Sequence, residues 1–216
     1  MSVVVEPGST RPSLTGFARA SVLVVLALVL TACGGGKPTA FAGITHAPYT
    51  ASSQALTDTE GKAWSLTQVT KPLTLVFFGY THCEDECPLV MSNLSSALVR
   101  LDKADREKVD LVFVTSDPAR DDGPVLRRYL DRYGEGFIGL TGKLDDIVTV
   151  ANSLAVQVDS GAKLPDGGYD LTAHSTTITA LAPDHTSTIL WDMNTKAGEF
   201  AADITAILHG KAPSES

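Results

Sequence analysis

The segment Leu73 to Gly79 (LTLVFFG) limits the folds open to this chain more than any other feature of the sequence. Its β-branched and aromatic side chains follow one another almost without a polar interruption. A strand formed here is therefore buried on both faces, as in a central parallel sheet covered by helices. Val109 to Thr115 is a second segment of the same kind. The two segments predict a layered α/β domain.

Helical periodicity follows both predicted strands. After the second strand, a helix is expected from Val125 to Tyr133; Asp121 and Asp122 can cap its start and Gly134 can end it. After the first strand, a helix is indicated by apolar residues that recur at spacings of three or four and form one helical stripe. These residues are Cys87, Met91, Leu94, Leu98 and Leu101.

The remaining segments complete the predicted topology. Short alternating stretches between residues 49 and 70 flank a turn in which Gly61 supplies a positive φ, so a β-hairpin is expected. Later elements are expected as a helix at 144–154, strands at 176–182 and 186–191, and a helix at 200–208. This order predicts a single thioredoxin-like domain of the α/β class, with a central mixed sheet flanked by helices and an N-terminal β-hairpin.

The N-terminus predicts a bacterial lipoprotein signal peptide. Arg11 and Arg19 precede an apolar run from Val22 to Leu30, about half the length that a membrane-spanning helix needs. Residues 30–33 (LTAC) then resemble the lipobox, in which cleavage before the cysteine exposes it for diacylglycerol attachment. An ordinary secretory signal, with Cys33 incidental, is the alternative. The lipobox predicts a lipid anchor at the extracytoplasmic face of the bacterial plasma membrane.

Domain boundaries follow from these segments. We expect the signal peptide at residues 1–32, the lipidated cysteine and a flexible tether at 33–48, the thioredoxin-like domain at 49–211 and a tail at 212–216. The chain carries 25 acidic and 17 basic residues, a net charge of −8. Since nucleic acids are bound through clustered basic residues, a nucleic-acid partner is not expected.

Two thiols lie where the first core strand gives way to a helix. Cys83 and Cys87 are four residues apart, at the strand end where open α/β sheets bind ligands. If one helix held both residues, their Cβ atoms would be about 5–6 Å apart, a spacing that admits a shared metal ion. A disulfide prefers about 3.5–4.5 Å, so a bridge here would need local distortion and would be comparatively easy to reduce.

Acidic neighbours favour a metal over a free nucleophile at this pair. The helix N-terminus stabilises a thiolate, whereas Glu84, Asp85 and Glu86 oppose a second negative charge on the two sulfurs. A bound cation resolves that conflict. Two alternatives stay open, namely a pair of buried core cysteines and a plain structural disulfide.

Several motifs together resemble one family, in the family's order, over about residues 55–195. They are GYTHC at 79–83, Asp85, Cys87-Pro88, TSDPARD at 115–121, GLTG at 139–142 and His174-Ser175. This set resembles the Sco (SenC) family of copper-binding cytochrome oxidase assembly proteins. The resemblance implies that Cys83, Cys87 and His174 bind one copper ion, as Cu(I) or Cu(II). Cys83 and Cys87 are also expected to form a redox disulfide.

The resemblance implies partners as well. It implies delivery of copper to, or reduction of the cysteines of, the binuclear copper site of cytochrome c oxidase subunit II. An upstream copper donor and, in an oxidising compartment, a separate thiol reductant are also expected. The chain departs from the family at Glu84 and Glu86, where the family commonly has a proline and an apolar residue.

The residue chemistry agrees with copper. Soft thiolates select Cu(I) and imidazole serves both copper states, whereas structural zinc prefers four protein ligands. Asp117, Arg120 and Asp121 are expected to cap and brace loops. The other histidines are expected to be solvated or structural; they are His46, His82, His185 and His209.

Three functions from different classes fit the thiol pair. The favoured one is a lipid-anchored copper chaperone, more a metallochaperone than an enzyme. The second is a thiol:disulfide oxidoreductase or peroxiredoxin-like peroxidase with Cys83 as nucleophile. Against it, thioredoxin-type catalysts use CxxC rather than CxxxC, and a peroxidase wants basic rather than acidic neighbours. The third is an interaction domain with an inert bridge.

Overall fold

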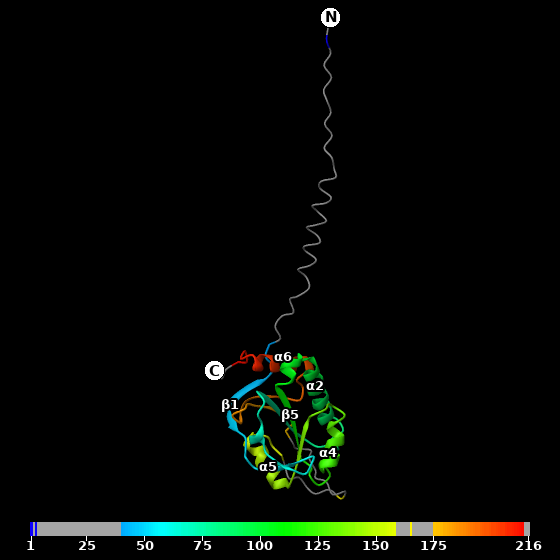
Figure 1. Cartoon of the computed structure of the whole chain (residues 1–216), viewed down its shortest axis with the longest axis vertical. Coiled ribbons are helices and arrows are strands. Elements are labelled where there is room, and N and C mark those ends of the chain that lie inside the picture. The colour runs from blue at the N-terminus through cyan, green and yellow to red at the C-terminus, as the bar shows by residue number, and fades with distance from the viewer. Residues whose placement is uncertain (2, 4–39, 159–164, 166–174, 214–216) are drawn as a thin grey trace. The chain divides into compact units, whose positions relative to one another are not determined.

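The computed structural model describes residues 1, 3, 40–158, 165 and 175–213. The chain divides into two units, Met1–Thr39 and Ala40–Ser216, and every described element belongs to the second (Figure 1). Cys33 and His174 lie outside the described residues, as does most of the predicted signal peptide. Among the described residues, no helix has the length and apolar character needed to cross a membrane.

An eight-stranded mixed sheet forms the centre of the second unit, in the order β1-β8-β7-β4-β5-β6-β2-β3. The strands are β1 (Ile44–Thr50), β2 (Leu56–Asp58), β3 (Ala63–Trp64), β4 (Leu73–Gly79), β5 (Val109–Thr115), β6 (Ile138–Thr141), β7 (Ile178–Leu181) and β8 (Thr186–Trp191). The helices are α2 (Glu86–Arg100), α3 (Lys103–Arg106), α4 (Gly123–Leu130), α5 (Leu144–Ser153) and α6 (Ala197–Leu208), with a short 3-10 helix at Leu66–Gln68.

The central strands β4 and β5 are parallel and almost entirely buried, as their sequences predict. All seven residues of β4 are buried, and β4 pairs in parallel with β5 so that Gly79 lies opposite Thr115. β6 continues the parallel set, whereas β7 pairs antiparallel with β4. The loops that follow β4 and β5 therefore leave the same edge of the sheet side by side.

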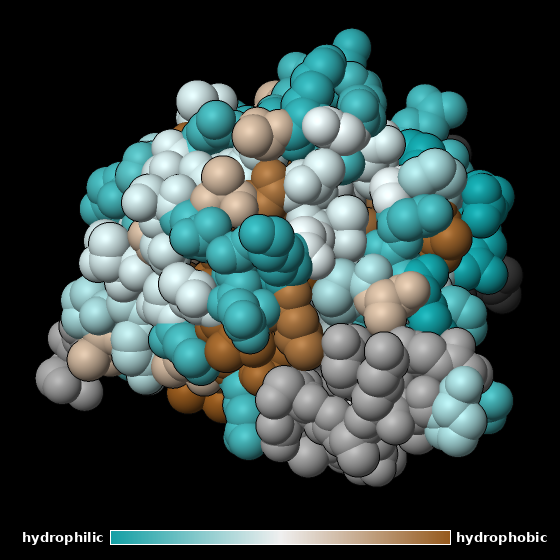
Figure 2. Space-filling model, turned by 90° about the horizontal axis from the view of Figure 1, so that it is seen from below, coloured by the Kyte–Doolittle hydropathy of each residue, from teal (hydrophilic) through white to brown (hydrophobic). Residues whose placement is uncertain are grey.

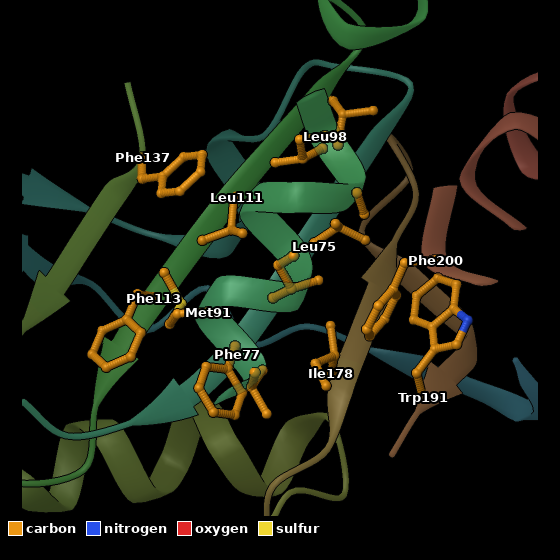
Figure 3. Packing of buried hydrophobic residues seen from close by; sticks show 14 of the residues in the cluster. Leu75, Phe77, Met91, Leu98, Leu111, Phe113, Phe137, Ile178, Trp191 and Phe200 are labelled. Atoms are coloured by element: carbon orange, nitrogen blue, oxygen red, sulfur yellow. The ribbon is translucent and has the colours of Figure 1, made fainter. Parts of the chain in front are cut away.

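Alternating residues of β4 serve two separate cores. Leu75 and Phe77 pack against α2, α4 and α6 in one cluster, which includes Met91, Phe113 and Trp191 (Figure 3). Val76 and Phe78 pack in a second cluster on the other face, which α5 covers. The sheet is thus a middle layer between helices. This arrangement confirms the predicted thioredoxin-like fold, including its mixed sheet and the hairpin of β2 and β3.

Residues 44–48 of strand β1 lie in the segment that the sequence predicts as the tether, and its last two residues lie in the predicted domain. The strand pairs antiparallel with β8 at the edge of the sheet, and five of its seven residues are exposed. An exposed edge strand lacks the apolar alternation by which strands are recognised in a sequence. Asp203 of α6 fastens the segment before β1, because its Oδ2 accepts hydrogen bonds from the N–H groups of Ala42 (3.0 Å) and Gly43 (2.8 Å).

Two further elements differ from the sequence-based expectation. β6 is a four-residue strand that the predicted order omits between the helices now seen as α4 and α5. α4 begins at Gly123 and ends at Leu130, earlier than predicted, and Asp122 alone caps it by accepting a hydrogen bond from the Val125 N–H (2.8 Å). Polar residues dominate the face of the molecule in Figure 2, and the largest group of apolar atoms lies near its centre.

Candidate metal centre

The two thiols sit in the connection between β4 and α2. Cys83 lies in the loop before the helix, where its N–H donates to the carbonyl oxygen of Tyr80 (3.3 Å). Cys87 lies in the first turn of α2. The condition that one helix holds both cysteines is therefore not met. The N–H of Cys87 instead donates to the sulfur of Cys83 (3.3 Å), and both cysteines are free thiols.

Close packing fixes the position of the Cys87 sulfur. A Cβ atom built on Gly79 would lie 2.9 Å from this sulfur, closer than real Cβ contacts come, and 3.1 Å from the ring of Phe77. Only a glycine at the end of β4 leaves room for the sulfur. Cys87 is fully buried, whereas Cys83 is half-buried. One sulfur is thus held in the core and the other is open to a partner.

Burial also sets the protonation of the site. It raises the pKa of the Cys87 thiol far above its ordinary value, outweighing a backbone hydrogen bond from Tyr80, and the adjacent Cys83 raises it further. Burial and Cys83 together raise the pKa of Tyr80 to about 12, so its hydroxyl stays protonated beside the Cys83 sulfur. A cation that replaces the proton of Cys87 would relieve the cost of burying a thiolate.

The acidic residues beside the thiols are not part of a ligand cluster. Glu84, Asp85 and Glu86 are all exposed to solvent. Within the described ranges, which omit His174, no three side chains of His, Cys, Asp or Glu form a group that could hold a metal ion. The two thiols are thus a partial donor set, and the expected third ligand, His174, lies outside the described residues.

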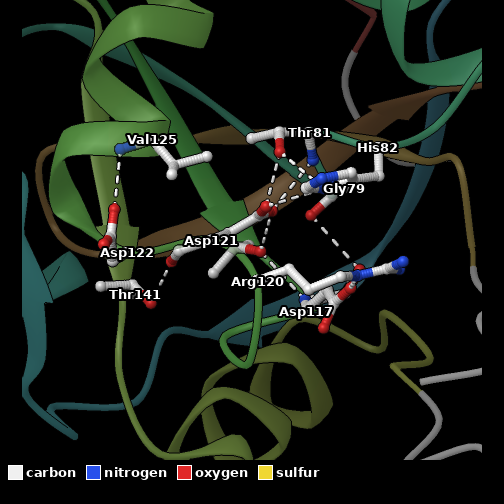
Figure 4. Close-up of polar contacts among 11 residues, drawn as sticks. Gly79, Thr81, His82, Asp117, Arg120, Asp121, Asp122, Val125 and Thr141 are labelled. Atoms are coloured by element: carbon white, nitrogen blue, oxygen red, sulfur yellow. Dashed lines mark hydrogen bonds and ion pairs between the residues drawn. The ribbon is translucent and has the colours of Figure 1, made fainter. Parts of the chain in front are cut away.

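A buried carboxylate braces the thiol loop. Asp121 accepts hydrogen bonds from the N–H of Thr81 (2.9 Å), from the hydroxyl of Thr81 (2.6 Å) and from the hydroxyl of Thr115 (2.7 Å) (Figure 4). The N–H of Ser116 donates to the carbonyl oxygen of Gly79 (2.7 Å) and closes the same edge of the sheet. These contacts join the loops after β4 and β5, in agreement with the expectation that Asp121 braces a loop.

Asp117 and Arg120 form a second, neighbouring pair. The guanidinium of Arg120 donates to Oδ2 of the fully buried Asp117, three residues earlier in the chain. Burial raises the pKa of Asp117, although the hydrogen bond from Arg120 opposes this shift. Both residues therefore act within the protein's own loop, as the sequence predicts, and Figure 4 shows them beside Asp121.

The four other histidines each make local contacts. His82 lies 3.1 Å from the Thr81 hydroxyl and 3.6 Å from Oδ1 of Asp121. His185 holds a positive φ of 67° in the turn between β7 and β8. His46 stacks on Tyr49 of β1, and His209 lies 2.9 Å from a carboxylate oxygen of Asp105.

Two residues of the site were missed from the sequence, namely Gly79 as the residue that admits the buried sulfur and Tyr80 as the hydroxyl beside Cys83. A glycine that ends an otherwise bulky strand is a usable signal, since such a residue often marks close approach of another group. The contact of Tyr80 depends on how the loop turns back, which local sequence does not encode.

The fold and the site together define a class. A thioredoxin-like sheet with a free thiol pair at the carboxyl end of its central parallel strand marks a thioredoxin-like thiol protein. The sequence profile of the SCO1/SenC family matches residues 43–209, and the chain belongs to this family. The resemblance found in the motifs is thereby confirmed.

Individual relatives agree with this membership. The copper-bound structure of ScoI from Bradyrhizobium japonicum is 30% identical, with a TM-score of 0.60 over 76% of this chain and 99% of that chain. The apo Sco1 protein from Thermus thermophilus is 28% identical, with a TM-score of 0.69 over 80% and 99% of the two chains. The mitochondrial protein SCO2 of Saccharomyces cerevisiae is 35% identical over 101 residues, which are 47% of this chain and 34% of that protein.

The chain spans only part of the curated relatives it matches. The matched segments cover 53%, 34% and 39% of three of these proteins. The solved structures, in contrast, are covered almost in full.

Proposed function

We propose that this protein is a membrane-anchored copper chaperone for cytochrome c oxidase assembly, binding one copper ion through Cys83, Cys87 and His174. The observation that carries the proposal is the free thiol pair held in contact at the end of β4, with one sulfur buried and one half-buried. Two soft sulfurs and one imidazole suit both Cu(I) and Cu(II). Copper in the 30%-identical ScoI structure supports the same ion.

The proposed partners follow from family membership. The copper acceptor is the binuclear site of cytochrome c oxidase subunit II, which the protein loads with copper or keeps reduced. An upstream protein supplies copper, and a separate thiol reductant keeps Cys83 and Cys87 open. Lipidation at Cys33 would hold the domain at the extracytoplasmic face of the plasma membrane, where such a reductant is needed because thiols oxidise there.

Copper titration of single variants tests the ligand set. We expect the reduced wild-type protein to bind one copper per chain and to show a sulfur-to-copper charge-transfer band as Cu(II). Cys83→Ser, Cys87→Ser and His174→Ala should each abolish or greatly weaken binding, since each removes one of three ligands. His185→Ala is the control and should bind as wild type. Equal affinity after loss of His174 would assign the third ligand to another residue.

A second candidate function for the same thiol pair is disulfide exchange, because the half-buried Cys83 sulfur accepts a hydrogen bond from the Cys87 N–H. Insulin reduction and peroxide consumption by the copper-free protein separate the two functions. The chaperone proposal expects both activities to stay near background. Rapid turnover that persists in His174→Ala but is lost in Cys83→Ser would favour the oxidoreductase.

A further inference from the structure

A basic groove lies beside the thiol loop. It has a volume of about 620 Å³ and is lined by Thr81, His82, Arg120, Val125, Arg128, Tyr129 and Arg132. Three of these seven residues are arginines, and none of the described residues that line the groove is acidic. Arg120 is paired with the buried Asp117, so Arg128 and Arg132 carry the charge that a ligand would meet. The chain as a whole carries a net charge of −8, so this concentration of positive charge runs against its overall balance.

Two of the arginines are available to a ligand. Arg128 and Arg132 are exposed to solvent on the last turn of α4 and just beyond it. Arg128 makes no ion pair within the described part of the chain. Arg132 stacks over the ring of Tyr129, with its guanidinium carbon 4.7 Å from the ring centre. Its Nε–H donates to the carbonyl oxygen of Tyr129 (3.4 Å). Stacking orients the guanidinium while its terminal NH2 groups remain available to a carboxylate.

The neighbouring arginine is committed differently. Arg127 donates to Asp131 (2.8 Å) and to the carbonyl oxygen of Phe137 (2.8 Å), and it is not among the residues that line the groove. Arg127 thus stabilises the end of α4, whereas Arg128 on α4 and Arg132 just beyond it line the groove.

Tyr129 supplies the ring on which Arg132 stacks, while its hydroxyl is buried. Tyr129 is 3% exposed, and no described residue meets its phenol oxygen in hydrogen-bond geometry. Burial, followed by the nearby phenol of Tyr133, raises the pKa of Tyr129 far above its ordinary value, so the hydroxyl keeps its proton.

We propose that this groove docks an acidic segment of a partner protein next to the copper site. The proposal rests on the proposed function in one respect, since the partner is taken to be a protein that exchanges copper with Cys83. Thr81 and His82 join the groove to the thiol loop, so a docked segment lies next to the half-buried sulfur. Small-molecule pockets are mostly apolar and enclose their ligands, whereas the arginines of this groove stand in solvent, which favours a protein segment.

Charge at this position would guide the partner to the thiols. Complementary charge raises the association rate more than the final affinity, and its effect falls as salt screens it over about 10 Å at 0.1 M. The acidic residues around Cys83, namely Glu84, Asp85 and Glu86, repel an acidic partner. The arginines of the groove therefore supply the attraction that brings such a partner to the thiols.

Fluorescence anisotropy with a model peptide tests the groove. The probe is hexaglutamate carrying a dye of no net charge, titrated with the full copper-free chain in nonionic detergent at about 0.05 M salt. We expect saturable binding that weakens as salt is raised, with no binding of the matched hexaglutamine peptide. Arg128→Gln with Arg132→Gln should weaken binding about tenfold, and Arg128→Gln alone by about threefold, since exposed charge pairs contribute modestly.

The control variant changes an arginine that does not line the groove. Arg100→Gln removes one exposed charge from the far end of α2 and should leave the affinity unchanged. Equal weakening by Arg100→Gln and Arg128→Gln would overturn the proposal, because attraction would then be general. Displacement of the peptide by inorganic phosphate at micromolar concentration would overturn it in favour of a small-anion site. Copper titration of wild type is a separate readout, so failure of the copper proposal and failure of the groove can be distinguished.

Discussion

At the scale of single residues, the site depends on a contact that leaves no space. Gly79 ends a fully buried strand, and the sulfur of Cys87 occupies the volume that any side chain at this position would need. The buried thiol and the glycine are thus one feature of the site, although they are eight positions apart in the sequence.

A methyl group at this position should displace the sulfur. We expect Gly79→Ala to destabilise the reduced protein by about 1–3 kcal/mol, the usual cost of overpacking a core, and to weaken copper binding. Urea denaturation and copper titration measure the two effects. Gly198→Ala is the matched control, because its added Cβ meets nothing within 4 Å. A Gly79→Ala protein as stable as wild type would show that Cys87 is not held as tightly as described.

At the scale of elements, two adjacent aspartates have different tasks. Asp121 is buried and fastens the thiol loop through Thr81, whereas Asp122 is exposed and caps α4. The sequence indicates both as caps or braces, since short acidic side chains are typical of such positions. Only the tertiary structure separates them, because the partner of Asp121 lies 40 residues away along the chain.

Replacing each aspartate should separate helix stability from loop geometry. Asp121→Ala leaves the Thr81 N–H without its acceptor, so we expect a loss of about 2–3 kcal/mol and weaker copper binding. Asp122→Ala should cost about 1 kcal/mol, as for a lost helix cap, with copper binding unchanged. Thermal unfolding and copper titration of both variants check this. If the two variants bound copper equally well, the brace would have no role in placing the thiols.

At the scale of the whole molecule, the sequence predicts what local patterns encode. The double-sided burial of β4 and β5, the stripe of α2 and the hairpin around Gly61 were all predictable, because each leaves a periodic or turn signal. The exposed edge strand β1 and the four-residue β6 leave little signal. The basic groove could not be predicted, since it brings α4 beside the loop that carries Thr81.

The two ends of the described domain are joined by one carboxylate. Asp203 of α6 is buried and binds Ala42, Gly43 and the indole N–H of Trp191 (2.9 Å). It therefore attaches the segment before β1 to the last helix. If this acceptor is removed, water cannot replace it as a hydrogen-bond partner of the indole N–H, because Trp191 is fully buried.

Loss of this carboxylate should loosen the N-terminal edge of the domain. We expect Asp203→Ala to lower the free energy of unfolding by about 2–3 kcal/mol, since it leaves three donors unpaired. Amide hydrogen exchange should speed up at Gly43 and along β1. The exposed Asp192→Ala is the control and should cost less than about 1 kcal/mol. Unchanged exchange in β1 would mean that its pairing with β8 alone holds the edge.

The residue-by-residue pairing of β4 with β5 limits how such proteins can diverge. Losing a single residue between Leu73 and Gly79 would send Phe77 and Phe78 into each other's layers and rotate the emerging loop to the opposite side. The length of this strand is therefore closed to gradual insertion or deletion. The turn at Gly61, where added atoms meet open space, is where such a lineage can change its length.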